Sequence, residues 1–342
     1  MIRIRSESGF SLVELLIATG LLLVVSSIVT SALLQMTKSQ ATIWNRTEMH
    51  SGVRGATELL QQEIGQAGRI GIPATMTITK TGGVDPDPQI ASGAAQCDPA
   101  NPSSYAVTGV NVSSVAGVYA QVSPASYMLL TVLDGVNQET IKVAGYSTAA
   151  TTIDACFTKH HDQGAVLQPM GSFGAGVIPP TGVANGSSGT VLKLFGDVNS
   201  DGNMVYVEYT CDTVNHNLYR RMMPWTQDPL NKPLAQILLS GIIPNPTDPT
   251  KPLSATNPPP CFVYQTTTMV VQGTSMTFVL NVAITLTVQS QQLDPITKTY
   301  QTETKALLNV SPRNVFNAWQ MAGIGYTDHI QSTPATITAL LQ

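Results

Sequence analysis

The strongest constraint on this chain is an apolar stretch near its N-terminus, residues 10–34, which contains a single charged residue, Glu14. At a rise of 1.5 Å per residue, about 20 apolar residues cross the hydrocarbon core of a bilayer. Arg3 and Arg5 precede the stretch, and basic residues next to a membrane span stay on the cytoplasmic side. The stretch therefore predicts one membrane-spanning helix, with the rest of the chain outside the cytoplasm.

Two other kinds of N-terminal segment fit this stretch less well. An ordinary secretory signal has a shorter apolar core that ends at a small-residue cleavage site. A plain signal anchor has the right length but does not explain Glu14, because a carboxylate in hydrocarbon is costly unless it is paired. Glu14 therefore requires a partner.

Residues Gly9–Ile17 (GFSLVELLI) resemble the prepilin motif of type IV pilins. The resemblance implies that a prepilin peptidase cuts after Gly9 and methylates Phe10, which becomes the first mature residue, with Glu14 as the fifth. The cut exposes a positive α-amino group, and the Glu14 carboxylate of the same or a neighbouring subunit can neutralise it. We therefore expect Gly9 and Phe10 to direct processing and Glu14 to direct assembly.

The helix is predicted to continue past the membrane as an amphipathic segment. Apolar residues recur at alternating steps of four and three: Met49, Val53, Ala56, Leu60, Ile64 and Ala67. Charged residues lie between them and predict a polar face: Arg46, Glu48, Arg54, Glu58 and Glu63. One bent helix is expected from about Phe10 to Gly68, with 10–36 in the membrane and 37–70 amphipathic.

Beyond Pro73 the sequence changes to short β-prone runs, such as 127–133 and 140–146. The clearest strand alternates over 277–288 and is predicted to pair with 297–310. Segments 85–104 and 169–188 are rich in Gly, Pro, Ser and Ala and are expected to be long surface loops. The predicted class is α+β, with the long N-terminal helix packed on an antiparallel β-sheet. Its expected divisions are a leader (1–9), the helix, a β-rich insertion (71–190), a C-terminal sheet region (191–316) and a tail (317–342).

Three further segments are similar to the PilW and pseudopilin J group of minor subunits: Leu59–Gly71, Leu218–Arg221 and Val310–Val315. This resemblance implies a low-abundance subunit that helps to start or cap a type IV pilus from the bacterial inner membrane. Its implied partners are other pilin subunits, the prepilin peptidase, the inner-membrane assembly platform and membrane lipid. Two alternatives stay open: a pseudopilin of type II secretion, and an adhesin or DNA-uptake module displayed on the filament.

One segment has the spacing of a calcium-binding loop, with candidate ligands Asp197, Asn199, Asp201, Asn203 and Glu208. Its flanks look like strands rather than the helices of an EF-hand, so Glu208 could face away from an ion. The alternative is a polar hairpin turn, because Asn, Asp and Gly are ordinary turn residues. Calcium is therefore a candidate cofactor, and both interpretations stay open.

Four cysteines are widely spaced and form no CxxC pair, which disfavours a zinc or thioredoxin-type site: Cys97, Cys156, Cys211 and Cys261. An even number on an exported chain favours two disulfides. Of three possible pairings we favour the sequential one, Cys97 with Cys156 and Cys211 with Cys261. Four reduced thiols are the alternative if the chain stays in the cytosol.

No catalytic motif is present in the sequence, so we expect no enzyme activity: it lacks a GxSxG elbow, an HExxH pair and a phosphate-binding glycine loop. His160 and His161 are interpreted as part of a solvated loop, because adjacent side chains point in different directions. The 17 basic and 21 acidic residues include no basic cluster beyond the first few positions, so nucleic acid is not expected as the primary partner.

Overall fold

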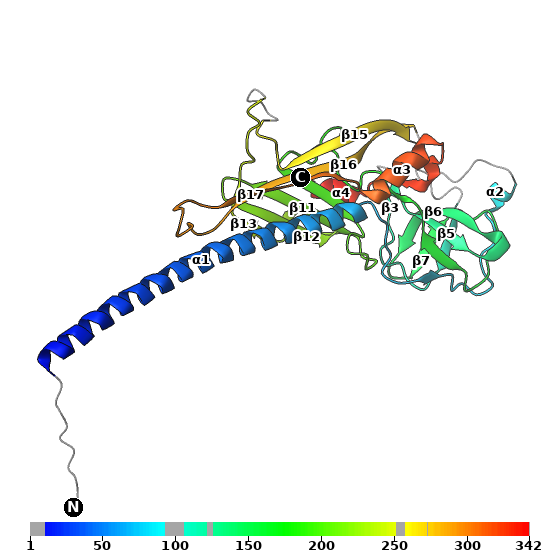
Figure 1. The fold of residues 1–342 in the computed structure, drawn as a ribbon. Coiled ribbons are helices and arrows are strands. Elements are labelled where there is room, and N and C mark those ends of the chain that lie inside the picture. The colour runs from blue at the N-terminus through cyan, green and yellow to red at the C-terminus, as the bar shows by residue number, and fades with distance from the viewer. Residues whose placement is uncertain (1–10, 93–105, 122–125, 251–256, 272, 342) are drawn as a thin grey trace, which may run out of the picture. The chain divides into compact units, whose positions relative to one another are not determined.

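A computed structural model describes residues 11–92, 106–121, 126–250, 257–271 and 273–341. The chain divides into two compact units. The first comprises Met1–Ser51 with Gln289–Glu303, and the second comprises Gly52–Val288 with Thr304–Gln342. The class is α+β: a long N-terminal helix and a β-rich region whose strands pair mostly antiparallel (Figure 1).

Helix α1 runs without a break from Leu12–Gln66, a length of 55 residues. Its first half is exposed and apolar, and α1 is long and apolar enough, by length and composition, to cross a membrane. The helix ends where Gly68 takes a positive φ of 82° and donates its N–H to the Phe195 carbonyl instead of continuing the helical pattern. The predicted end is confirmed, whereas the predicted start at Phe10 lies outside the described residues.

The predicted apolar stripe of α1 is confirmed. Every member is at most 8% exposed: Met49, Val53, Ala56, Leu60, Ile64 and Ala67. This burial follows from the 3.6-residue period, which places all six on one side of the helix.

The segment after α1 forms a six-stranded sheet in the order β1-β8-β5-β6-β7-β2. All five of its strand pairings are antiparallel. The strands are β1 Met76–Thr77, β2 Val107–Asn111, β5 Leu129–Leu133, β6 Glu139–Ser147, β7 Thr152–Ala155 and β8 Val166–Pro169. Smaller elements lie beside them: α2 Pro88–Ala91, the pair β3 Ala120–Gln121 and β4 Ser126–Tyr127, and the 3-10 turn η2 Gly135–Asn137. The strands expected at 127–133 and 140–146 are thus present.

Two four-stranded sheets follow. One contains β10 Val191–Gly196, β11 Val205–Asp212, β12 Asn217–Pro224 and β13 Gln236–Ser240 in that order, with η3 Pro229–Asn231 before its last strand. The other contains β14 Ile242–Ile243, β15 Phe262–Val271, β16 Thr274–Gln289 and β17 Thr302–Val310. β16 pairs with β14, β15 and β17, so the predicted pairing of the late alternating strand with the one after it is confirmed.

The predicted tail is built into the fold rather than trailing from it. It contributes α3 Arg313–Gly323, η4 Thr327–His329, β18 Ile330–Gln331 and α4 Ala335–Leu340. β18 pairs in parallel with β9 Ser172–Phe173. Ile337 and Leu340 are fully buried in the same hydrophobic cluster as the six-stranded sheet. The sequence prediction assigned these residues no structure, although the buried residues of α3, Val315, Ala318 and Ala322, recur at steps of three and four.

The prediction of a surface loop over 169–188 is wrong for its middle part. Phe173, Val177 and Ile178 are at most 1% exposed. Gly176 lies so close to Gly68 that a Cβ atom on it would come within 2.2 Å of the Gly68 backbone. The small residues here permit close packing of backbones, which the composition alone cannot distinguish from an open loop. Of the other expected loop, 85–104, residues 93–104 lie outside the described ranges.

Candidate functional site

The structure describes only part of the N-terminal motif, from Ser11 onward. Gly9 and Phe10 lie outside the described residues, so cleavage and methylation stay predictions. Glu14 lies in the first turn of α1 and is exposed. Its apolar neighbours Leu15 and Leu16 are also exposed, by 58% and 63%. An apolar surface of this length needs a bilayer or an apolar partner to cover it.

The sequence predicts Glu63 on the polar face of α1, and the structure corrects this. The Glu63 side chain is only 3% exposed. It forms an ion pair with the Arg220 guanidinium of β12 and accepts a hydrogen bond of 2.5 Å from the Tyr209 hydroxyl of β11. Burial raises the pKa of Tyr209 well above its ordinary range, so this hydroxyl remains a donor. A buried charge must be paired, and these two partners fix the rotation of the helix on its sheet.

The candidate calcium loop is folded around an arginine. The Arg69 Nε lies 3.5 Å from Asp197 Oδ2, and Arg69 Nη1 donates to the Ser200 hydroxyl at 2.8 Å. Asp197 is 1% exposed and also accepts from the Asp201 N–H at 2.9 Å, while Asp201 accepts from the Asn203 N–H at 2.8 Å. Asp197 is thus paired with the Arg69 guanidinium, and both Asp197 and Asp201 accept backbone hydrogen bonds within the turn.

The remaining candidate ligands point elsewhere. Glu208 lies inside β11, with Lys193 and Arg221 as its strand neighbours, and Arg221 Nη1 is 3.6 Å from its carboxylate. The Asn199 amide contacts the Met222 sulfur at 3.7 Å. Within the described residues, no three His, Cys, Asp or Glu side chains are arranged to hold a metal ion. The strand register places Glu208 away from the turn, as the alternative interpretation allowed, and calcium binding by the loop stays a prediction.

A disulfide joins Cys211 of β11 to Cys261, the residue before β15. This is one half of the sequential pairing. Both cysteines are buried, at 3% and 5% exposure. The other half involves Cys97, which lies outside the described residues, so that bond stays a prediction.

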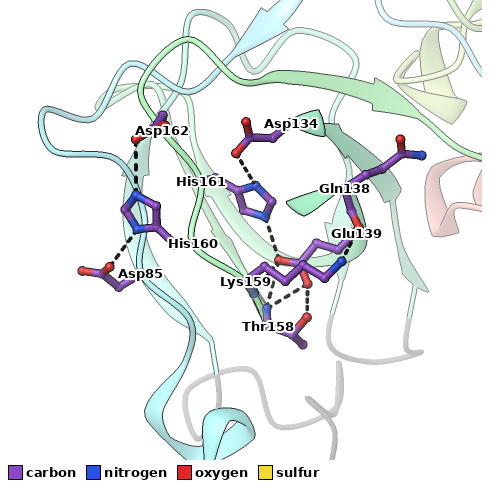
Figure 2. Close-up of polar contacts among 9 residues, drawn as sticks. All are labelled: Asp85, Asp134, Gln138, Glu139, Thr158, Lys159, His160, His161 and Asp162. Atoms are coloured by element: carbon purple, nitrogen blue, oxygen red, sulfur yellow. Dashed lines mark hydrogen bonds and ion pairs between the residues drawn. The ribbon is translucent and has the colours of Figure 1, made fainter. Parts of the chain in front are cut away.

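The two adjacent histidines occupy different environments (Figure 2). His160 is exposed, and its two ring nitrogens lie 2.9 Å from Asp85 Oδ1 and 3.3 Å from Asp162 Oδ1. The hydrogen bond to Asp85, followed by that to Asp162, raises the pKa of His160 above its ordinary value. The solvated-loop interpretation therefore holds for His160.

The same interpretation is wrong for His161, whose ring is fully buried. Its Nδ1 lies 3.1 Å from Asp134 Oδ2 and its Nε2 lies 2.8 Å from Glu139 Oε1. The Phe157 ring meets it edge-on, with 5.8 Å between ring centroids. We call His161, Asp134 and Glu139 the His161 clamp. Sequence reasoning missed it because its acidic members lie more than 20 positions before the histidine, with no motif to connect them.

Comparison with known proteins adds no family: no family model, no curated protein and no solved structure matches the chain.

Proposed function

We propose that this chain is a minor pilin, a membrane-anchored structural subunit that helps to assemble a type IV pilus and has no catalytic activity of its own. The observation that carries the proposal is the Gly9–Ile17 motif with Glu14 at the head of α1. Two structural features support it. The first half of α1 suits a bilayer, and the second half carries a buried stripe beside antiparallel sheets.

The proposed role of Glu14 follows from electrostatics. A carboxylate in an apolar helix is tolerated when a positive group meets it. Removal of residues 1–9 would create such a group at the Phe10 nitrogen, on this chain or on a neighbouring one. Filament assembly would then stabilise a charge that is unfavourable in the isolated subunit.

Mass spectrometry of the protein isolated from membranes tests the processing step directly. We expect a mature chain that begins at N-methylated Phe10. Gly9→Ala should still be processed in part, whereas a bulky residue, as in Gly9→Leu, should leave the precursor intact. A working protein that retains Met1 would contradict the proposal.

A second experiment tests assembly. Glu14→Ala should be exported and cleaved normally but should enter filaments poorly, as measured by immunoblotting of sheared filaments against membranes. Thr19→Ala is a matched control, because the hydrogen bonds given for the Thr19 hydroxyl stay within its own helix, to the Leu15 and Leu16 carbonyls at 3.0 and 3.1 Å. Equal incorporation of both variants would remove Glu14 from the mechanism.

A pseudopilin of type II secretion remains the alternative of the same class, because it would share the anchor, the processing and the sheet region. Deletion of the gene separates the two functions. Loss of pili with normal secretion of exoproteins supports the minor pilin, and the reverse result supports the pseudopilin.

A further inference from the structure

The loop between β16 and β17, residues 290–301, lies against the part of α1 that follows its apolar half. Both segments belong to the same compact unit, which comprises Met1–Ser51 and Gln289–Glu303. The His50 ring of α1 contacts the Glu303 carboxylate at the start of β17. The Thr42 side chain hydrogen-bonds the Asp294 carboxylate within the loop. These two contacts hold the loop along one side of the helix.

The loop extends toward the apolar half of α1 (Figure 1). Glu303 meets the helix at His50, whereas Asp294 meets it at Thr42. At 1.5 Å per residue, these two levels of the helix are about 12 Å apart. The loop then closes on itself, because the Lys298 N–H donates to the Asp294 carbonyl at 2.9 Å. The tip of the loop, residues 295–298, therefore lies at the end nearer the apolar half.

The charge pattern of α1 places this level of the helix beside a membrane surface. Between Glu14 and Lys38 the chain has no charged residue, and about 20 such residues cross the hydrocarbon core. A lysine at the end of a span reaches the headgroups, and Thr42 follows Lys38 by about 6 Å along the helix. Ile43 and Trp44 are 65% and 74% exposed here, and tryptophan is typical of the headgroup layer. This placement rests on the membrane anchoring in the proposed function.

The loop presents apolar and basic side chains to its surroundings. Leu293, Ile296 and Tyr300 are 51%, 57% and 49% exposed, and Lys298 is also exposed. The single acidic residue of the loop, Asp294, is 1% exposed and accepts from the Ile296 N–H at 2.7 Å. Exposed apolar side chains next to a membrane span suit the lipid interface. An ammonium group suits the phosphate of a lipid headgroup.

We propose that the β16–β17 loop is a second membrane contact, with Leu293, Ile296 and Tyr300 in the headgroup layer and Lys298 against lipid phosphate. A single spanning helix can turn about its own axis in the bilayer. A loop held to one side of that helix removes this freedom, because only one rotation of α1 brings the loop onto the lipid. The contact therefore fixes which side of α1 faces the membrane surface.

Photo-crosslinking of the full chain in vesicles of phosphatidylethanolamine and phosphatidylglycerol tests the contact. Benzoylphenylalanine replaces one exposed residue at a time, and mass spectrometry identifies what each probe captures. At Ile296, and separately at Leu293, we expect a yield of lipid adduct several-fold above that at Val136. Val136 is a matched control because it is 95% exposed and lies in the insertion that follows α1. A probe at Leu22, 65% exposed in the apolar half of α1, reports the anchor itself.

The three kinds of position separate the possible results. Lipid adducts at Leu22 and Ile296, with few at Val136, support the contact. Lipid capture at Leu22 but at neither loop position overturns the contact and leaves the anchor intact. Absence of lipid capture at Leu22 contradicts the anchor and the contact together. Capture of a second copy of this chain at Ile296 in place of lipid also overturns the proposal, since the loop would then be a subunit interface.

Discussion

Arg220→Met tests whether the buried carboxylate of Glu63 depends on its cation. Methionine retains much of the aliphatic length of arginine and removes only the charged end. Glu63 would keep the hydrogen bond from Tyr209 but would lose the guanidinium that neutralises it. The variant therefore leaves a carboxylate that is 3% exposed without a counter-charge.

The expected cost follows from the burial of the pair. Removing one partner of a buried ion pair costs about 3–5 kcal/mol. The Arg220 side chain is 19% exposed and Tyr209 still donates, so we expect a cost at or just below the lower end of that range, about 2–3 kcal/mol. Arg54→Met is the matched control: its Nε lies 2.7 Å from Glu58, but the two side chains are 76% and 63% exposed. Exposed pairs of this kind contribute about 0.3–0.5 kcal/mol.

Urea unfolding of the full chain in micelles, followed by near-ultraviolet circular dichroism, measures both variants. The double variant Glu63→Gln with Arg220→Met removes both charges, so it should be more stable than the sum of the single changes predicts. A free energy of unfolding for Arg220→Met within about 0.5 kcal/mol of that for Arg54→Met would refute the reasoning. The buried pair would then contribute no more than a surface pair.

Two further predictions concern the disulfide and the β16–β17 loop. Replacing Cys211 and Cys261 together by alanine should lower the free energy of unfolding by about 2–4 kcal/mol, because the bond closes a loop with a sequence separation of 50; unchanged urea midpoints would contradict this. The pKa of Asp294 is lowered to about 2, chiefly by the Thr297 N–H, with the Ile296 N–H and the Gln301 side chain also contributing. Because this value lies below the ordinary pKa of about 3.9, the stabilisation is present above about pH 4 and is lost as the pH falls toward 2. Asp294→Asn should therefore make the protection factors of the Ile296 and Thr297 amides, corrected for the intrinsic exchange rate, insensitive to pH over that range. An acid sensitivity equal to that of the unmodified chain would contradict the assignment.

Elements with a long, clear period were predictable from the sequence. The stripe of α1 repeats over about five turns, and β16 alternates over more than ten residues, so each carries its own signal. Glu63 shows the limit of such patterns. It lies three residues after Leu60 and four before Ala67, at core spacing, but only the distant Arg220 and Tyr209 make its burial acceptable. A charge at core spacing is itself a signal that a buried partner exists.

The candidate sites were less predictable because they depend on register and on distant partners. The calcium spacing counts residues along the chain, whereas pairing of β10 with β11 places Glu208 opposite Lys193 and away from Asp197. Arg69, which follows α1, places its positive charge beside Asp197, one of the residues that the loop pattern predicted to bind an ion. The His161 clamp likewise combines a turn and a loop that only the strand order brings together. Spacing along the chain identifies possible ligands and hydrogen-bonding residues. The pairing of the strands then determines which of these residues lie close together.

The insertion and the last residues of the chain stabilise one another, although the sequence suggested divisions between them. Gln331 donates to the carbonyls of Leu129 and Met170, at 3.2 and 2.5 Å, and accepts from the Tyr119 hydroxyl. Buried polar groups of this kind are costly to leave unpaired. Deleting residues 71–190 would therefore expose the core shared with α4 as well as remove a surface. A role of the insertion in adhesion is better tested by substitutions on exposed turns, such as Val136→Asp at η2, than by removing the segment.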